Sequence, residues 1–153
     1  MAASHLDPFL SAALKDTKSG FSSGIFAFYL TEDFGSELHI GGIDPRCDDK
    51  DIEYHDILKL EDGNKKPSYW AIHNAKIRVN GNIIASKIST IIDSGTDIIF
   101  GHKDIVSAIY EKIPFADGAN HLLPCHLPAT QFPSITISWG DNGKEWTIVD
   151  HER

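Results

Sequence analysis

The chain has 153 residues, enough for a single domain with its own hydrophobic core, and we expect residues 1–153 to form one. Hydrophobic residues make up 41% and charged residues 24%, as in soluble globular proteins, and no apolar run approaches the roughly 18 residues that span a bilayer. The formal charge is -8, with 14 Lys and Arg against 22 Asp and Glu. Without a basic stripe to neutralise phosphates, we expect neither a nucleic-acid nor a membrane partner.

The histidines, cysteines and first residues constrain the setting less. Protonation of all eight histidines would balance the 22 carboxylates, so a protein that works in acid fits, as does an acidic protein with scattered histidines. Cys47 and Cys125 are able to pair, but nothing in the sequence requires it. The first 14 residues lack the basic and apolar regions of a signal peptide, which leaves an intracellular protein or a processed N-terminus.

The first third of the chain predicts a helix followed by a hairpin. Asp7 is a good N-cap and Pro8 suits the first helical position, so we expect a short helix that ends at residues 19–20. Residues 25–30 are β-rich, and residues 37–42 alternate after a turn, which together predict a hairpin. A charged loop follows, and then a strand-like segment over residues 52–60.

The rest of the chain predicts further antiparallel pairs and one more helix. Asn80-Gly81 is a strong hairpin signal between a strand at residues 75–79 and strands at residues 83–85 and 88–92. Residues 103–113 place their apolar positions on one helical face, and Pro114 ends that helix. The remaining expected strands are at residues 69–72, 134–139 and 145–149, the last two forming a second hairpin. The fold class is therefore mainly β, with antiparallel sheets and two short helices.

Residues 91–96 read Ile-Ile-Asp-Ser-Gly-Thr and carry the strongest sign of chemistry. We expect Asp93 at the end of a buried strand, in a partly dry place where nearby N–H and hydroxyl groups hold it ionised. Asp93 also fits a plain strand-ending cap whose oxygens accept turn N–H bonds. The neighbours favour a functional role, because Gly95 permits close backbone approach and the hydroxyls of Ser94 and Thr96 can orient a carboxylate.

The chain resembles the C-terminal lobe of the pepsin-like (A1) aspartic endopeptidases, in a fungal-looking version. Five motifs agree with that family in order and spacing, and the fifth is the stretch after the predicted helix, which contains three matching pieces. The first four are Phe26-Ala27-Phe28-Tyr29-Leu30, Leu38-His39-Ile40-Gly41-Gly42-Ile43-Asp44, Tyr69-Trp70-Ala71-Ile72 and Ile91-Ile92-Asp93-Ser94-Gly95-Thr96, and the pieces of the fifth are Pro124-Cys125, Phe132-Pro133-Ser134-Ile135 and Gly143-Lys144-Glu145-Trp146-Thr147-Ile148. The fold that this resemblance implies is one lobe of an acid protease, a partial barrel of antiparallel sheets.

The resemblance also implies a mechanism. Two aspartates, one from each lobe, share a water that attacks a peptide bond, and Asp93 would be one of the two. Ser94 matches a position that braces the two loops, and Gly95 and Thr96 match positions that bond the substrate backbone. Ile91 and Tyr69 match apolar cleft-lining positions, although ordinary core packing suits both equally well.

The comparison with the family also shows what this sequence lacks. The first catalytic loop, the flap, an apolar-Gly segment and the final strands are not in it, and the usual disulfide partner of Cys125 would lie beyond Arg153. We therefore expect the chain alone to be inactive, with the N-terminal lobe or a second copy of itself as partner for cleaving peptides or proteins. A non-catalytic binding protein, again possible as a dimer, is the alternative. The resemblance implies a secreted or vacuolar parent enzyme.

Other chemistries fit the sequence poorly. His121, Cys125 and His126 are metal ligands by type, but their spacing matches no compact zinc pattern. Ser94 lacks the Gly-x-Ser-x-Gly context of a serine nucleophile. We expect Asp97, a second carboxylate near Asp93, to be solvated. No metal and no cofactor are expected.

Overall fold

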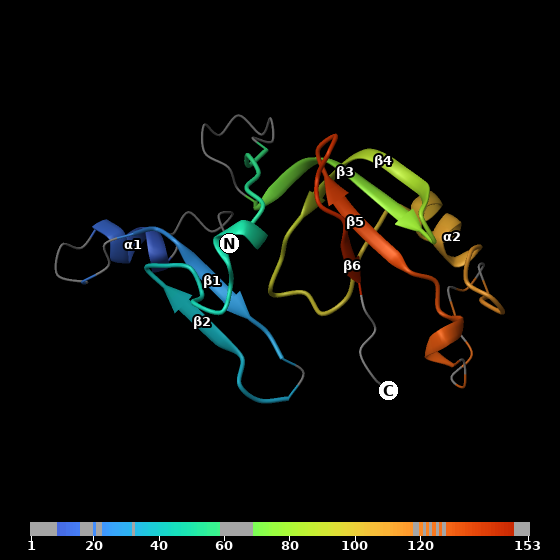
Figure 1. Ribbon diagram of the computed structural model, residues 1–153, viewed down its shortest axis with the longest axis horizontal. Coiled ribbons are helices and arrows are strands. Elements are labelled where there is room, and N and C mark those ends of the chain that lie inside the picture. Colours follow the sequence, from blue (N-terminus) through green and yellow to red (C-terminus); the bar gives the residue numbers. More distant parts are fainter. Residues whose placement is uncertain are drawn as a thin grey trace. The chain divides into compact units, whose positions relative to one another are not determined.

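The structure, a computed structural model, describes residues 9–15, 20, 23–31, 33–58, 69–117, 120, 122, 124, 126 and 128–148. These residues contain two α-helices and six strands in two antiparallel sheets, and the sheets do not close into a barrel (Figure 1). The predicted mainly β class is confirmed. The chain divides into two compact units, Met1–Tyr54 (the first unit) and His55–Arg153 (the second unit), which are described separately.

The first unit contains the predicted hairpin. Helix α1 spans Phe9–Lys15, whereas its expected start at Asp7 and Pro8 lies outside the described residues. Strands β1 (Phe26–Tyr29) and β2 (Glu37–Ile40) pair antiparallel. The connecting turn is closed by the Thr31 hydroxyl, which donates to the carbonyl oxygen of Phe34 at 2.8 Å.

The second unit is built on a four-stranded sheet in the order β4-β3-β5-β6, which can be followed in Figure 1. The Asn80-Gly81 hairpin joins β3 and β4 as predicted, since both residues adopt the positive φ (49° and 77°) of a type I′ turn. The strands are β3 (Ala71–Val79), β4 (Asn82–Ile91), β5 (Ile135–Trp139) and β6 (Trp146–Ile148).

Strands β3 and β4 are each continuous, whereas the sequence predicted two shorter strands in place of each. A residue with a left-handed conformation lies at each predicted break. Asn74 (φ 59°) lies between Ile72 and Ala75, where the β3–β4 register shifts, and Lys87 (φ 57°) lies at the next shift. Each shift inserts an extra residue into one strand, so the apolar alternation slips without ending the pairing. The predicted breaks at residues 73–74 and 86–87 are therefore bulges inside continuous strands.

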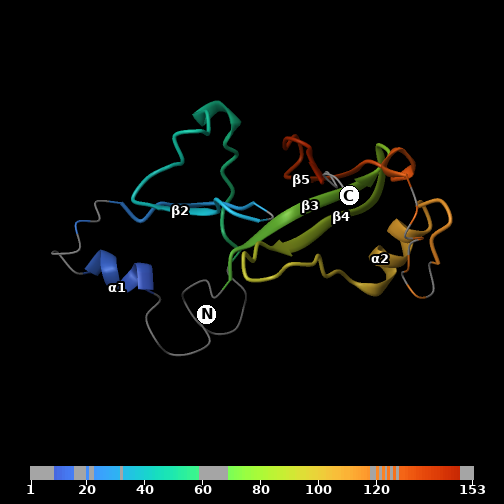
Figure 2. The same ribbon diagram turned by 90° about the horizontal axis from the view of Figure 1, so that it is seen from below.

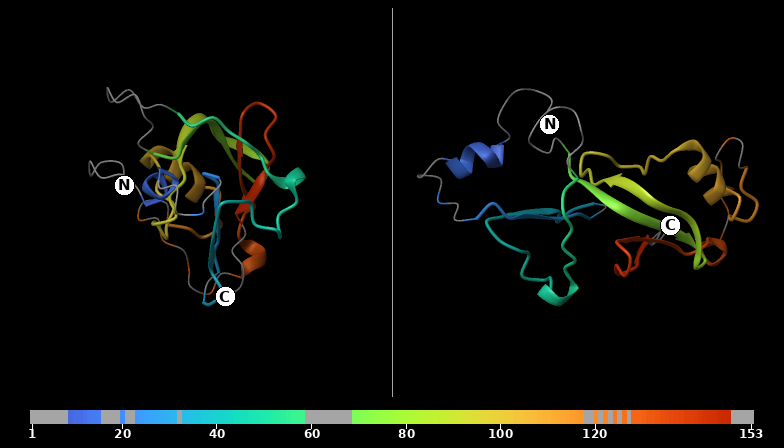
Figure 3. Two further views of the ribbon diagram at one scale, coloured as in Figure 1. Left: turned by 90° about the vertical axis from the view of Figure 1, so that its left-hand side faces the viewer. Right: turned by 90° about the horizontal axis from the view of Figure 1, so that it is seen from above.

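The core of the second unit lies along the central strand β3. Ala71, Ala75 and Val79 are buried there, and Ile113 is buried just after helix α2. Helix α2 (Lys103–Tyr110) contacts β4, and the segment that joins them runs back along the hairpin (Figure 2; Figure 3, right). No helix among the described residues is long and apolar enough to cross a membrane.

The strand predicted over residues 52–60 is wrong for the part that the structure describes. Only a single bridge forms there, between Ile57 and Ile72, supported by the Leu58 N–H donating to the Ala71 carbonyl oxygen at 2.7 Å. A short 3-10 helix, Asp49–Asp51, lies just before this segment. The charged residues that interrupt the segment, among them Asp56, explain the lack of a longer ladder.

Candidate active site

Asp93 lies directly beyond the last backbone hydrogen bond of the β3–β4 pair. Strand β4 ends at Ile91, and the N–H of Ile92 still donates to the carbonyl oxygen of Trp70 at 2.9 Å. The sheet therefore fixes the chain up to one residue before the carboxylate. It also brings Tyr69, the neighbour of Trp70, to the same end of the sheet as residues 91–96.

Both oxygens of the Asp93 carboxylate are held by its own loop. The Gly95 N–H donates to Oδ1 at 2.9 Å, and the Thr96 hydroxyl donates to Oδ2 at 2.7 Å. These bonds, that of Thr96 first, lower the pKa of Asp93 below its ordinary value because they favour the charged form. A side chain at position 95 would bring a Cβ within 3.3 Å of Oδ1, so glycine allows the loop to close on the carboxylate.

The loop is exposed, which differs from the partly dry setting that we predicted. All residues from Ile91 to Phe100 are exposed, and β4 is an edge strand of the described sheet. Ile91 and Tyr69 are 56% and 48% exposed, so neither side chain belongs to the core of the second unit. Asp97 is exposed, as expected. The two donors, Thr96 first, therefore lower the pKa of Asp93 although the loop is exposed.

Several residues that support this end of the sheet were missed from the sequence. The Trp139 indole N–H donates to the Thr90 hydroxyl at 2.8 Å, and His73 Nδ1 lies 2.9 Å from the Ser89 hydroxyl oxygen. The first link joins strands that are far apart in the sequence, and the second joins the two strands of the β3–β4 hairpin. The only sign in the sequence was polar residues among the apolar ones just before Ile91, which does not reveal a partner.

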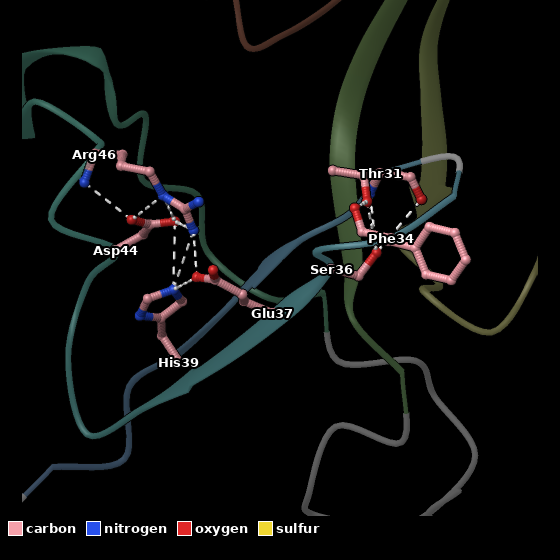
Figure 4. Close-up of polar contacts among 7 residues, drawn as sticks. All are labelled: Thr31, Phe34, Ser36, Glu37, His39, Asp44 and Arg46. Atoms are coloured by element: carbon pink, nitrogen blue, oxygen red, sulfur yellow. Dashed lines mark hydrogen bonds and ion pairs between the residues drawn. The ribbon is translucent and has the colours of Figure 1, made fainter.

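A second charged cluster lies in the first unit, around Asp44 (Figure 4). Asp44 is buried, and Arg46 reaches both of its oxygens, with Nε 2.9 Å from Oδ1 and Nη2 2.7 Å from Oδ2. These bonds, with one from the Arg46 backbone N–H, lower the pKa of Asp44 to about 2. Arg46 also bonds Glu37 at 2.7 Å, and His39 Nε2 lies 2.9 Å from the same Glu37 oxygen. The guanidinium further lies 3.9 Å from the ring centre of Tyr29. Since both Asp44 oxygens are occupied, the cluster is suited to holding the first unit together.

The histidines and cysteines that are metal ligands by type give no second candidate site among the described residues. Among the described residues, no group of three His, Cys, Asp or Glu side chains lies close enough to bind a metal. His121 and Cys125 lie outside the described residues, so their expected roles stay untested. Cys47 is an exposed free thiol.

Comparison with known proteins covers nearly the whole chain. The profile of the family described as eukaryotic aspartyl protease matches residues 8–152. The chain belongs to this family. The predicted resemblance to the pepsin-like peptidases is confirmed, including its fungal aspect, since a secreted fungal protease is among the relatives.

The relatives of this aspartyl protease chain are much longer than the chain itself. It is 34% identical over 145 residues to secreted aspartyl protease 1 of Malassezia globosa, covering 89% of the chain and 33% of that protein. It is 30% identical over 123 residues to pepsin F of Oryctolagus cuniculus, covering 76% and 30%. With aspartic protease 1 of Toxoplasma gondii the identity is 32% over 111 residues, covering 71% and 16%. The chain thus spans a third or less of the length of these relatives.

Proposed function

We propose that this chain supplies one half of the active site of an acid-acting aspartic endopeptidase, with Asp93 as one of two catalytic aspartates. The observation that carries the proposal is the held carboxylate, which receives the Gly95 N–H and the Thr96 hydroxyl at the exposed end of a sheet. Membership of the aspartyl protease family over residues 8–152 supports it independently.

The lowered pKa suits Asp93 to the role of general base. A carboxylate that stays ionised in mild acid accepts a proton from a bound water, and the resulting nucleophile attacks the carbonyl carbon of a peptide bond. The second aspartate, from the rest of the enzyme or from a second copy, protonates the carbonyl oxygen. Two such carboxylates at close range titrate as a pair, which extends activity into acid. The chain alone lacks that partner and is inactive.

The neighbouring residues have supporting roles in this proposal. In this proposal Gly95 and Thr96 bond the backbone of an extended peptide substrate, and Ser94 braces the loop against the partner half. Ile91 and Tyr69 line the cleft, which fits their exposure at the same end of the sheet. The substrate is a peptide or an unfolded protein segment, since the chemistry needs an accessible backbone carbonyl.

The test is a peptidase assay in acid. The chain alone and the longest product of its gene are each incubated with an acid-denatured protein, and peptide products are followed by mass spectrometry. We expect cleavage by the longer product only, and its loss in Asp93→Ala. Cleavage that survives Asp93→Ala would contradict the assignment.

A non-catalytic binding role is the second candidate. The observation that favours it is the exposed apolar run after the loop, where Ile98, Ile99 and Phe100 are 59%, 75% and 77% exposed. Apolar patches of this kind mark surfaces that contact another protein. Sedimentation of the chain tests it: a stable dimer without peptidase activity in any product of the gene favours binding, and a monomer speaks against the dimer.

We further propose that the parent enzyme is secreted or vacuolar. The Malassezia globosa relative, described as secreted, supports this setting. Fractionation of source cells and their medium, followed by immunoblotting, tests it; a protein confined to the cytosol would contradict it.

A further inference from the structure

Trp139 connects two strands that are not neighbours in the sheet. It is the last residue of β5, which pairs with β3, whereas Thr90 lies on β4 at the other side of β3. The indole N–H nevertheless donates to the Thr90 hydroxyl oxygen at 2.8 Å. The indole therefore reaches across the whole width of the central strand.

Small side chains on β3 make this reach feasible. Trp139 pairs in register with Ala75, which is completely buried, and Ala71 at the start of the same strand is buried as well. An alanine leaves the space above the strand that a six-membered and a five-membered ring need. The ring of His55 packs against the indole at 5.8 Å between centres, which restricts the indole further.

The bulge in β3 anchors the backbone next to Trp139. Asn74 adopts a left-handed conformation there, and its carbonyl oxygen accepts the N–H of Gly140 at 3.0 Å. The backbone at Trp139 is thus held to β3 by its register partner Ala75 and by this adjacent bond. Bulges are common beside active sites, where they re-aim a side chain.

We propose that Trp139 is a positioning residue for Asp93, acting through Thr90. Thr90 is three residues before Asp93, and the Ile92 N–H between them donates to the Trp70 carbonyl oxygen at 2.9 Å. β4 is an edge strand, so its outer side gives no ladder bonds among the described residues, and the indole supplies a side-chain tie in their place. The inference rests on the proposed function of Asp93, because misplacing a catalytic group by about 1 Å is able to lower a rate by about 100-fold.

The test compares four variants of the chain by native-state amide hydrogen exchange. Trp139→Phe keeps a ring and removes the donor, Thr90→Val keeps the shape and removes the acceptor, and Thr90→Ser keeps the hydroxyl. Thr136→Val is the matched control, since its hydroxyl bonds Glu145 on the same sheet but away from Asp93. We expect the Ile92 amide to exchange about three- to tenfold faster in Trp139→Phe and Thr90→Val, and at the original rate in the other two.

The double variant adds a second criterion. If the two residues act through one bond, Trp139→Phe with Thr90→Val accelerates the Ile92 amide no more than the stronger single change. An Ile92 rate that stays unchanged, or one that rises together with the Gly140 amide, would overturn the proposal, since the second outcome is a general loss of stability.

Kinetics in the longer gene product give the functional arm. We expect both disrupting variants to lower kcat and leave KM unchanged, with Thr90→Ser restoring kcat. A fall in KM alone, or no change in kcat, would overturn the positioning role. Activity that persists in Asp93→Ala would contradict the proposed function of Asp93 and not the Trp139–Thr90 link. The hydrogen-exchange results test that link without any catalysis.

Discussion

Replacing Arg46 by Gln removes the guanidinium group that donates to both oxygens of the buried Asp44 carboxylate. Three contacts of 2.7–3.1 Å are lost, while the backbone N–H bond to Oδ1 at 2.9 Å remains. The pKa of Asp44 stands at about 2 against an ordinary 3.8, and the Arg46 side chain is the largest cause. We therefore expect the pKa of Asp44 to rise from about 2 and to stop short of 3.8, since the backbone bond still favours the charged form.

The same change has a defined effect on acid stability. Because the folded-state pKa of Asp44 is lowered, its contribution to folding is present above pH 3.8 and is lost as the pH falls through about 2. In Arg46→Gln this contribution shrinks, so the stability of the first unit depends less on pH between 2 and 4. Carbon-detected NMR titration of the Asp44 carboxyl measures the pKa, with Arg78→Gln as the control, since Arg78 pairs with Glu145 in the second unit. An Asp44 pKa that stays at about 2 in Arg46→Gln would refute the reasoning.

Three further predictions concern the second unit. Thr96→Val removes the 2.7 Å bond to Asp93 and raises its pKa, measured by carboxyl NMR titration; an unchanged pKa would show that the Gly95 bond suffices. Gly81→Ala destabilises by about 1–2 kcal/mol in urea unfolding, because φ is 77° and nothing lies within 4 Å to add a clash; no loss would contradict the type I′ turn. Val79→Ala lowers the free energy of unfolding by about 2 kcal/mol in the same assay, because the Val79 side chain is 1% exposed. Ile83→Ala lowers it by less than about 1 kcal/mol, because Ile83 is 58% exposed. Equal losses in the two variants would contradict the placement of the core.

The local turn chemistry made much of the fold predictable. Asn80-Gly81 and the alternating segments gave the β3–β4 and β5–β6 hairpins, because those signals lie within a few neighbouring residues. The bulges were not predictable in the same way, since the left-handed Asn74 bonds Gly140, which lies 66 residues later in the chain. The strand expected over residues 52–60 failed for a related reason, as only Ile57 finds a partner.

The candidate site shows the same division. Asp93 and its donors Gly95 and Thr96 lie in one loop, so the sequence was sufficient to predict their association. The exposure of that loop depends on which strand lies at the edge of the sheet, which local pattern does not encode. The support from Trp139 was hidden because its partner Thr90 is 49 residues away and two strands across.

The central claim is that Asp93 performs the chemistry, and the paired variants Asp93→Asn and Asp97→Asn test it most directly in the longest gene product. Both remove one exposed carboxylate at nearly the same place, so solubility and net charge change equally. The account predicts that kcat/KM for a peptide in acid falls by at least about 1,000-fold in Asp93→Asn and stays within about threefold of the original in Asp97→Asn. Equal activities in the two variants would contradict it.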